Sequence, residues 1–200
     1  MFWVISLIIL SCSGEGGKQP ASHPSSTSTL PASSPFLYIN TLEDINLGSV
    51  SVGEEVIIEA GSQRIIGQWD GKRRIYYDAG NKELFRVKSD EEGMKLLSND
   101  VLIVKVKWNY PDGKLKVAFN EEMTDSYEIK AKEGNRFKVD YKEAEFKQYH
   151  LMGNQRDEVL ADSLKIGGFG LSKGSGLLLL GEIGLAEKLA VIAELTLVGK

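Results

Sequence analysis

The chain is poor in the residues that build most metal centres and nucleophilic active sites. Its 200 residues include one cysteine, Cys12, and two histidines, His23 and His150. A lone cysteine excludes a disulfide within the chain, and so few histidines argue against zinc sites and histidine-dependent catalysis. The formal net charge of −4 argues against general nucleic-acid binding. We therefore expect no cofactor other than a covalent group on the cysteine.

The sequence also lacks a stretch that combines membrane-spanning length with freedom from charge. Residues 177–198 are long enough to span a bilayer but contain Glu182, Glu187, Lys188 and Glu194. Charges inside a bilayer are costly, whereas a helical wheel places Glu187, Lys188 and Glu194 on one half and most apolar residues on the other. The pattern predicts a core helix over residues 181–195, preceded by a buried strand at residues 177–180.

The N-terminus differs in composition from the rest of the chain. Residues 1–11 are uncharged and mostly apolar. A run of this length is too short to span a bilayer and is typical of a signal-peptide core. The alternative is an uncleaved apolar anchor followed by an incidental cysteine.

The stretch Ile9-Leu10-Ser11-Cys12 resembles the lipobox of bacterial lipoproteins. The resemblance implies removal of residues 1–11 and acylation of Cys12, which becomes the new N-terminus. Several acyl chains give stable membrane anchoring. The resemblance places the protein in a bacterial cell envelope, either on the outer membrane or on the outer leaflet of the cytoplasmic membrane. By the same analogy, Ser13 permits outer-membrane sorting.

The segment between the cysteine and residue 36 has the composition of a tether. Residues 13–35 contain four of the five prolines and almost no apolar residues. Such a segment buries too little surface to order itself. We therefore divide the chain into a signal peptide (1–11), a lipidated disordered tether (12–36) and a folded domain (37–200).

The folded domain alternates in hydropathy between frequent turn signals such as Asp70-Gly71 and Pro111-Asp112-Gly113. Alternation with a period of two indicates half-buried strands. Predicted strands lie at residues 56–59, 64–69, 74–77, 83–88, 102–108, 114–119, 127–132, 136–141, 143–150 and 159–166. The aromatic residues predicted to lie in the core are Trp69, Tyr76, Tyr77, Phe85, Trp108 and Phe119. The glycine-rich residues 167–176 read as a connector.

These elements predict a mainly β fold. An antiparallel meander of about ten to twelve short strands tends to curl, and we expect it to close into a barrel around or against the one hydrophobic helix. The strand number, the final helix and the phrase from Tyr77 to Val87 resemble the tubby-like and LURP-one-related barrels, a group that includes the phospholipid scramblases. The resemblance covers roughly residues 37–200 and bears on the fold.

Lysines recur at alternate positions of the predicted strands. If consecutive strands pair, they share the outer face and form a basic patch; they are Lys105, Lys107, Lys114, Lys116, Lys130, Lys132 and Lys138. Anionic envelope lipids or polymers are suitable partners for such a patch. The alternative is a solvated face whose lysines discourage edge pairing, and Glu128 and Asp140 interrupt the patch.

No catalytic constellation is apparent. Paired acids occur at Glu54-Glu55, Glu121-Glu122, Glu143/Glu145 and Asp157-Glu158. Turn and strand-face acids account for all of them, although a hydrolase could place two carboxylates across a cleft. We expect a membrane-anchored, non-catalytic binding or structural module whose partner is an anionic envelope lipid or polymer, or an envelope protein. The alternatives are an envelope hydrolase using a carboxylate pair, and a lipid carrier if the barrel is hollow.

Overall fold

The structure is a computed structural model, and it describes residues 37–41, 43–108, 110–132, 136–142, 144–152, 158–161, 164–167 and 173–200. Residues 32–200 belong to one compact unit. Cys12, the predicted signal peptide and the predicted tether lie outside the described residues.

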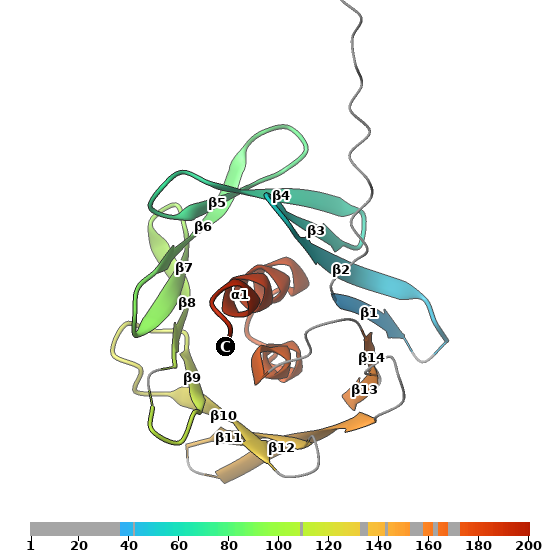
Figure 1. Cartoon of the computed structure of the whole chain (residues 1–200), viewed down its shortest axis with the longest axis vertical. Coiled ribbons are helices and arrows are strands. Elements are labelled where there is room, and N and C mark those ends of the chain that lie inside the picture. The colour runs from blue at the N-terminus through green and yellow to red at the C-terminus, as the bar shows by residue number, and fades with distance from the viewer. Residues whose placement is uncertain are drawn as a thin grey trace, which may run out of the picture. The chain divides into compact units, whose positions relative to one another are not determined.

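One antiparallel sheet dominates the described part of the chain. Its strands are β1 (Leu37–Thr41), β2 (Asn46–Val52), β3 (Val56–Ala60), β4 (Gln63–Trp69), β5 (Arg74–Tyr77), β6 (Glu83–Ser89), β7 (Gly93–Ser98), β8 (Val101–Lys107), β9 (Leu115–Ala118), β10 (Ser126–Lys132), β11 (Arg136–Tyr141), β12 (Ala144–Met152), β13 (Glu158–Ala161) and β14 (Leu164–Gly167). Each strand pairs with its neighbour in sequence, and β1 also pairs with β14, so the pairing order is that of a closed barrel (Figure 1). The predicted mainly β, antiparallel fold with a C-terminal helix is confirmed.

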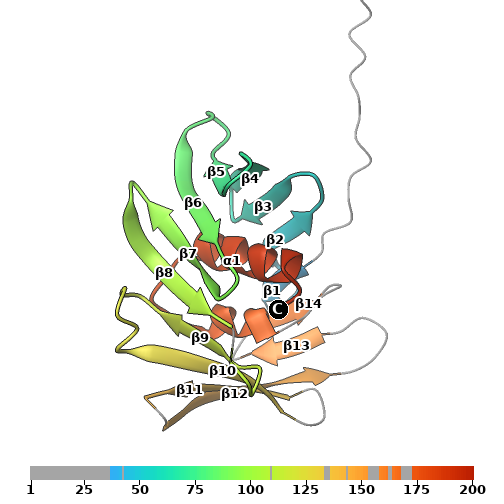
Figure 2. The ribbon, with the colours of Figure 1, turned by 60° about the vertical axis from the view of Figure 1, so that its left-hand side comes forward.

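Two helical elements occupy the interior of the ring. They are the 3-10 helix η1 (Lys173–Leu179) and the α-helix α1 (Leu185–Leu197). Both views show these orange and red coils enclosed by the strands (Figure 1, Figure 2). Within the described residues, no helix has the length and hydrophobicity needed to cross a bilayer.

Alternating side chains explain why the strands enclose the helices. In β8, Val104 and Val106 are fully buried, whereas Lys105 and Lys107 between and beyond them are partly exposed. Inward apolar faces of this kind need a partner, and the buried leucines of η1 and the apolar residues of α1 provide it. One core therefore joins β1 to β11 and β14 to the central helices.

A glycine permits the closest approach of α1 to the sheet. A side chain at Gly48 of β2 would lie 3.1 Å from a methyl group of Leu185 and 2.7 Å from the carbonyl oxygen of Glu59. A real Cβ does not fit at these distances, so the absence of a side chain lets the helix pack directly on β2. This contact fixes the N-terminal half of α1 against one side of the barrel.

Several local predictions were wrong. Strands β1, β2 and β7 were not predicted, and the single strand predicted at residues 159–166 is the pair β13 and β14. The serine- and glycine-containing β2 has a weak apolar alternation, which hides it in the sequence. The buried strand predicted at residues 177–180 is part of η1, because a short apolar run without polar alternation fits either structure.

The helix also differs from its predicted bounds of 181–195. It begins at Leu185, after Gly184 in an extended conformation. It ends where Gly199 adopts a φ of 71°, which lets Gly199 and Lys200 donate backbone hydrogen bonds to the carbonyls of Thr196 and Leu195. This is the helix-ending arrangement that glycine favours.

Glu194 was predicted to lie on the polar side of the helix, and this was wrong. It is 4% exposed and makes a buried contact with β5. Its Oε1 lies 2.8 Å from Nε of Arg74 and accepts a 2.7 Å hydrogen bond from the hydroxyl of Tyr76. Burial raises the pKa of Glu194, although the Tyr76 hydrogen bond and the Arg74 charge oppose the shift. The helix is therefore buried almost all round, with its one inward carboxylate neutralised by the sheet.

We predict that Glu194→Gln lowers the free energy of unfolding by about 3 kcal/mol, because it leaves the Arg74 guanidinium buried without a counter-charge. Glutamine still accepts the Tyr76 hydrogen bond, so the change isolates the charge. Urea denaturation followed by circular dichroism measures the difference.

Glu59→Gln is the matched control, because Glu59 pairs with Arg64 at 2.7 Å on the exposed surface. This control should change the free energy of unfolding by less than about 1 kcal/mol. Equal effects of the two substitutions would contradict the buried ion pair.

Candidate functional site

Strands β6 to β11 present lysines on the outer face of the barrel. Strand alternation places them on the side opposite the core, together with Lys114 just before β9. We call this set the lysine face: Lys88, Lys95, Lys105, Lys107, Lys114, Lys116, Lys130 and Lys138.

The strand register brings like charges directly opposite one another. Lys95 lies between Lys88 on β6 and Lys105 on β8, and Lys107 of β8 pairs with Lys116 of β9. Like charges at directly opposed positions destabilise a sheet. The arrangement therefore requires nearby carboxylates, an anionic partner, or both.

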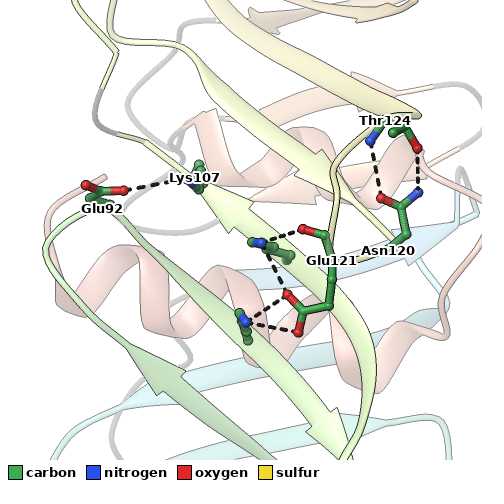
Figure 3. A network of polar contacts seen from close by, with 7 residues as sticks. Glu92, Lys107, Asn120, Glu121 and Thr124 are labelled. Atoms are coloured by element: carbon green, nitrogen blue, oxygen red, sulfur yellow. Dashed lines mark hydrogen bonds and ion pairs between the residues drawn. The ribbon is translucent and has the colours of Figure 1, made fainter.

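One group of lysines is organised by Glu121, in the loop between β9 and β10. Its carboxylate lies 2.7 Å from Nζ of Lys95 and 3.2 Å from Nζ of Lys105, and its carbonyl also accepts a 2.6 Å hydrogen bond from Lys105. Figure 3 shows this bridge, with Glu92 contacting Lys107 beside it. Because these contacts lie on the surface, each contributes little to stability.

A second group surrounds Glu128 on β10. Its carboxylate lies 2.7 Å from Lys130, 3.1 Å from Lys114 and 3.2 Å from Lys116. Burial alone would raise the pKa of Glu128, but hydrogen bonds from these lysines outweigh it and lower the pKa to about 2. Glu128 is therefore ionised throughout the physiological range.

Asp140 on β11 continues the second group. It is buried at 5% exposure, and its carboxylate lies 2.9 Å from Nζ of Lys138 and 3.4 Å from Nζ of Lys130. The two acids that interrupt the predicted basic patch thus act as its bridges. They hold lysines of neighbouring strands in fixed positions.

A surface hollow of about 390 Å³ lies over the first group. Its charged lining residues are Lys88, Lys95, Lys105, Lys107, Asp90 and Glu92. Lys88 is exposed and makes no ion pair with any other described residue. The hollow therefore contains three lysines that are paired with carboxylates and one lysine, Lys88, that is exposed to a ligand. Lysines outnumber acids in its lining.

The structure brings together most of the lysines that the sequence singled out. Lys105, Lys107, Lys114, Lys116, Lys130 and Lys138 share the face, whereas the side chain of Lys132 lies outside what the structure describes. Lys88 and Lys95 were missed, although Lys88 follows the alternation of a predicted strand. Lys95 was missed because β7 itself was not predicted.

The alternatives have less structural support. A carrier needs interior space, which η1 and α1 occupy. A cleft of about 640 Å³ remains at the N-terminal end of α1, with a mostly apolar lining that includes Leu47, Ile65 and Leu185. Of the paired acids considered for hydrolysis, Glu121 is engaged by lysines, and Glu143 and Asp157 lie outside the described residues. Among the residues that the structure describes, no group of three or more metal-ligating side chains is close enough to hold an ion.

Comparison with models of protein families, with curated proteins and with solved structures finds no match to this chain.

We predict that Glu128→Gln removes part of the acid sensitivity of the fold. Because the pKa of Glu128 is about 2 in the folded chain and near 4.5 without its partners, its contribution is complete above pH 4.5. The contribution is lost as the pH falls towards 2. The variant should be less stable than the wild type at neutral pH, and the difference should vanish near pH 2.

Thermal unfolding at a series of pH values measures this difference. Glu122→Gln is the control. Glu122 is exposed, and its substitution removes the same charge at a position outside the lysine contacts. A stability difference for Glu128→Gln that does not change with pH would contradict the proposed cause.

Proposed function

We propose that this chain is a non-catalytic, lipid-anchored binding module of a bacterial envelope, and that its lysine face contacts an anionic lipid or polymer. One observation carries the proposal: the lysines of three adjacent strands, Lys88, Lys95 and Lys105, stand in register beside a surface hollow. Glu121 offsets the repulsion between Lys95 and Lys105, but Lys88 beside them has no ion pair with another described residue. A ligand with several phosphates or carboxylates would relieve that repulsion.

The balance of charge on this face favours an anionic partner. Seven of the eight lysines contact a carboxylate, and the five acids involved are Glu92, Asp112, Glu121, Glu128 and Asp140. The local excess is positive although the whole chain has a net charge of −4. An attraction of this kind acts over about a Debye length and weakens in salt. Such a short-range attraction suits a partner that is held near the lysine face by other means.

A tether to the membrane would supply that closeness. The lipobox resemblance assigns an acyl anchor to Cys12, and the proline- and serine-rich residues 13–35 would let the domain move near the surface. Anchoring raises the effective concentration of the lysine face near envelope lipids and polymers. A contact that is weak in solution is therefore sufficient.

The filled interior agrees with a role for the outer surface. Because η1 and α1 fill the interior, the barrel is a rigid support for its outer side chains. The lysines project from strands whose register is fixed by backbone hydrogen bonds. Binding at an outer face requires no opening of this core. Carriage of a lipid inside the barrel would require α1 to move.

We predict that residues 32–200 co-sediment with vesicles of anionic lipid at low salt and less at physiological salt, and do not co-sediment with zwitterionic vesicles. Changing Lys88, Lys95, Lys105 and Lys107 to glutamine should weaken this binding at least about tenfold, since each lysine near an anionic surface contributes on the order of 1 kcal/mol.

The matched control changes four exposed lysines elsewhere to glutamine: Lys72, Lys82, Lys142 and Lys200. It alters net charge equally but leaves the lysine face intact, so it should bind nearly as well as the wild type. Equal loss in both variants would mean that overall charge, and no particular face, governs the interaction. No binding by the wild type would direct the search to anionic polymers and protein partners.

A further inference from the structure

One end of the barrel is the end at which the chain enters it. Leu37 begins β1 there and pairs with Val50, close to the turn that joins β2 to β3. Two strands further on, the same end holds the turn between Trp69 of β4 and Arg74 of β5. We call this the entry end, and any tether that precedes Leu37 joins the barrel on this side.

The C-terminal end of α1 lies at the entry end as well. Glu194 in the last turns of the helix contacts Arg74, and the Arg74 guanidinium lies 5.9 Å from the centre of the Trp69 ring. Leu197 follows Glu194 by three residues and therefore lies on the same side of the helix. These contacts connect Trp69 to the end of α1 through a single buried arginine.

Large apolar side chains are exposed at this end. Trp69, which was predicted to lie in the core, is 54% exposed, and Leu197 and Val198 are 42% and 41% exposed. Trp69 pairs with Arg74 at the very end of β4, so its ring lies against the arginine at the rim of the barrel and outside the core. Leu197 and Val198 are exposed because the chain turns away at Gly199 before they can be covered.

We propose that the entry end rests on a lipid bilayer, with the Trp69 indole and the side chains of Leu197 and Val198 in the headgroup region. This proposal rests on the membrane tether of the proposed function. Tryptophan is favoured at membrane interfaces because its apolar ring and its N–H group suit both sides of the boundary. A tether that joins the barrel at this end presents these residues to the membrane first.

The charges around Trp69 make this contact different from that of the lysine face. Arg73 is paired with Asp70 at 3.0 Å, so the turn carries little excess charge apart from Lys72. Glu54 and Glu55 lie in the neighbouring turn of the same end. Contact of the entry end should therefore depend on apolar insertion, and it should persist in salt and on zwitterionic lipid.

The opposite end provides an internal comparison. Ile45, between β1 and β2, and Val101, at the start of β8, are 61% and 68% exposed. They lie away from Leu37, and neither is aromatic. Exposed apolar side chains thus occur at both ends of the barrel, but only the entry end has both an exposed tryptophan and the start of β1 among the described residues.

The test uses residues 12–200 coupled through Cys12, the one cysteine, to a maleimide lipid in phosphatidylcholine vesicles with brominated acyl chains. The coupling supplies the tether chemically, so the result depends neither on acylation in the cell nor on the lysine face. Residues 12–200 contain two of the three tryptophans, Trp69 and the buried Trp108. Bromine quenches tryptophans that insert into the bilayer.

We expect the brominated lipid to lower the emission of Trp69 roughly twofold, as for a side chain at the boundary of headgroups and acyl chains. The Trp69 component is the difference between the wild type and Trp69→Phe, which retains Trp108. High salt should leave the quenching unchanged.

The matched control carries Val101→Trp in the Trp69→Phe background and places the probe at the opposite end. It should show no quenching beyond that of Trp69→Phe. Absence of Trp69 quenching in tethered protein, or equal quenching of the two probes, would overturn the proposal. Quenching that disappears in salt would also overturn it and would reassign the contact to electrostatic attraction.

Discussion

Burial of α1 against the inward faces of the strands is the interaction on which the rest of this structure depends. The strands alternate between apolar and polar side chains, and their apolar faces point into a ring that would otherwise be empty. The helix is apolar almost all round, so it is unsuited to a surface and suited to this interior. Its one inward carboxylate, Glu194, meets Arg74 and Tyr76, which fixes the rotation and depth of the helix without leaving a lone charge in the core.

The same alternation produces the outer surface. Each residue that faces α1 has neighbours that face solvent, and on β6 to β11 those neighbours are largely lysines. Their spacing is therefore set by the backbone register and not by flexible loops. Glu121 and Glu128 bridge several lysines each, and so the face is an ordered array of positive groups. Such an array is better suited to a polyanionic surface or polymer than to a single small ion.

Much of the fold could be predicted from the sequence, because the alternation that marks the strands and the apolar run that marks the helix are both local patterns. Alternation in residues 102–108 and 127–132 and the apolar run near the C-terminus need no knowledge of distant contacts. Glu194 could not be placed in this way, because its burial depends on Arg74, which is far from it in sequence. Trp69 has the alternation of a core residue, but it is the last residue of β4 and lies beyond the core. Six lysines of the lysine face were predicted from alternation, whereas Lys88 and Lys95 were missed and the role of Glu121 depends on where a loop folds. Cys12 remains a sequence-based prediction.

Native-state hydrogen exchange of residues 32–200 tests the central claim most directly. If α1 shares one core with the strands around it, its amides from Leu189 to Ala193 should exchange only through global unfolding, with the same protection free energy as the amides of β3 and β8. That result would establish the helix and the ring as one cooperative unit. Exchange of the α1 amides at a lower free energy, while the strands stay protected, would contradict the account and would show a ring that stands without its helix.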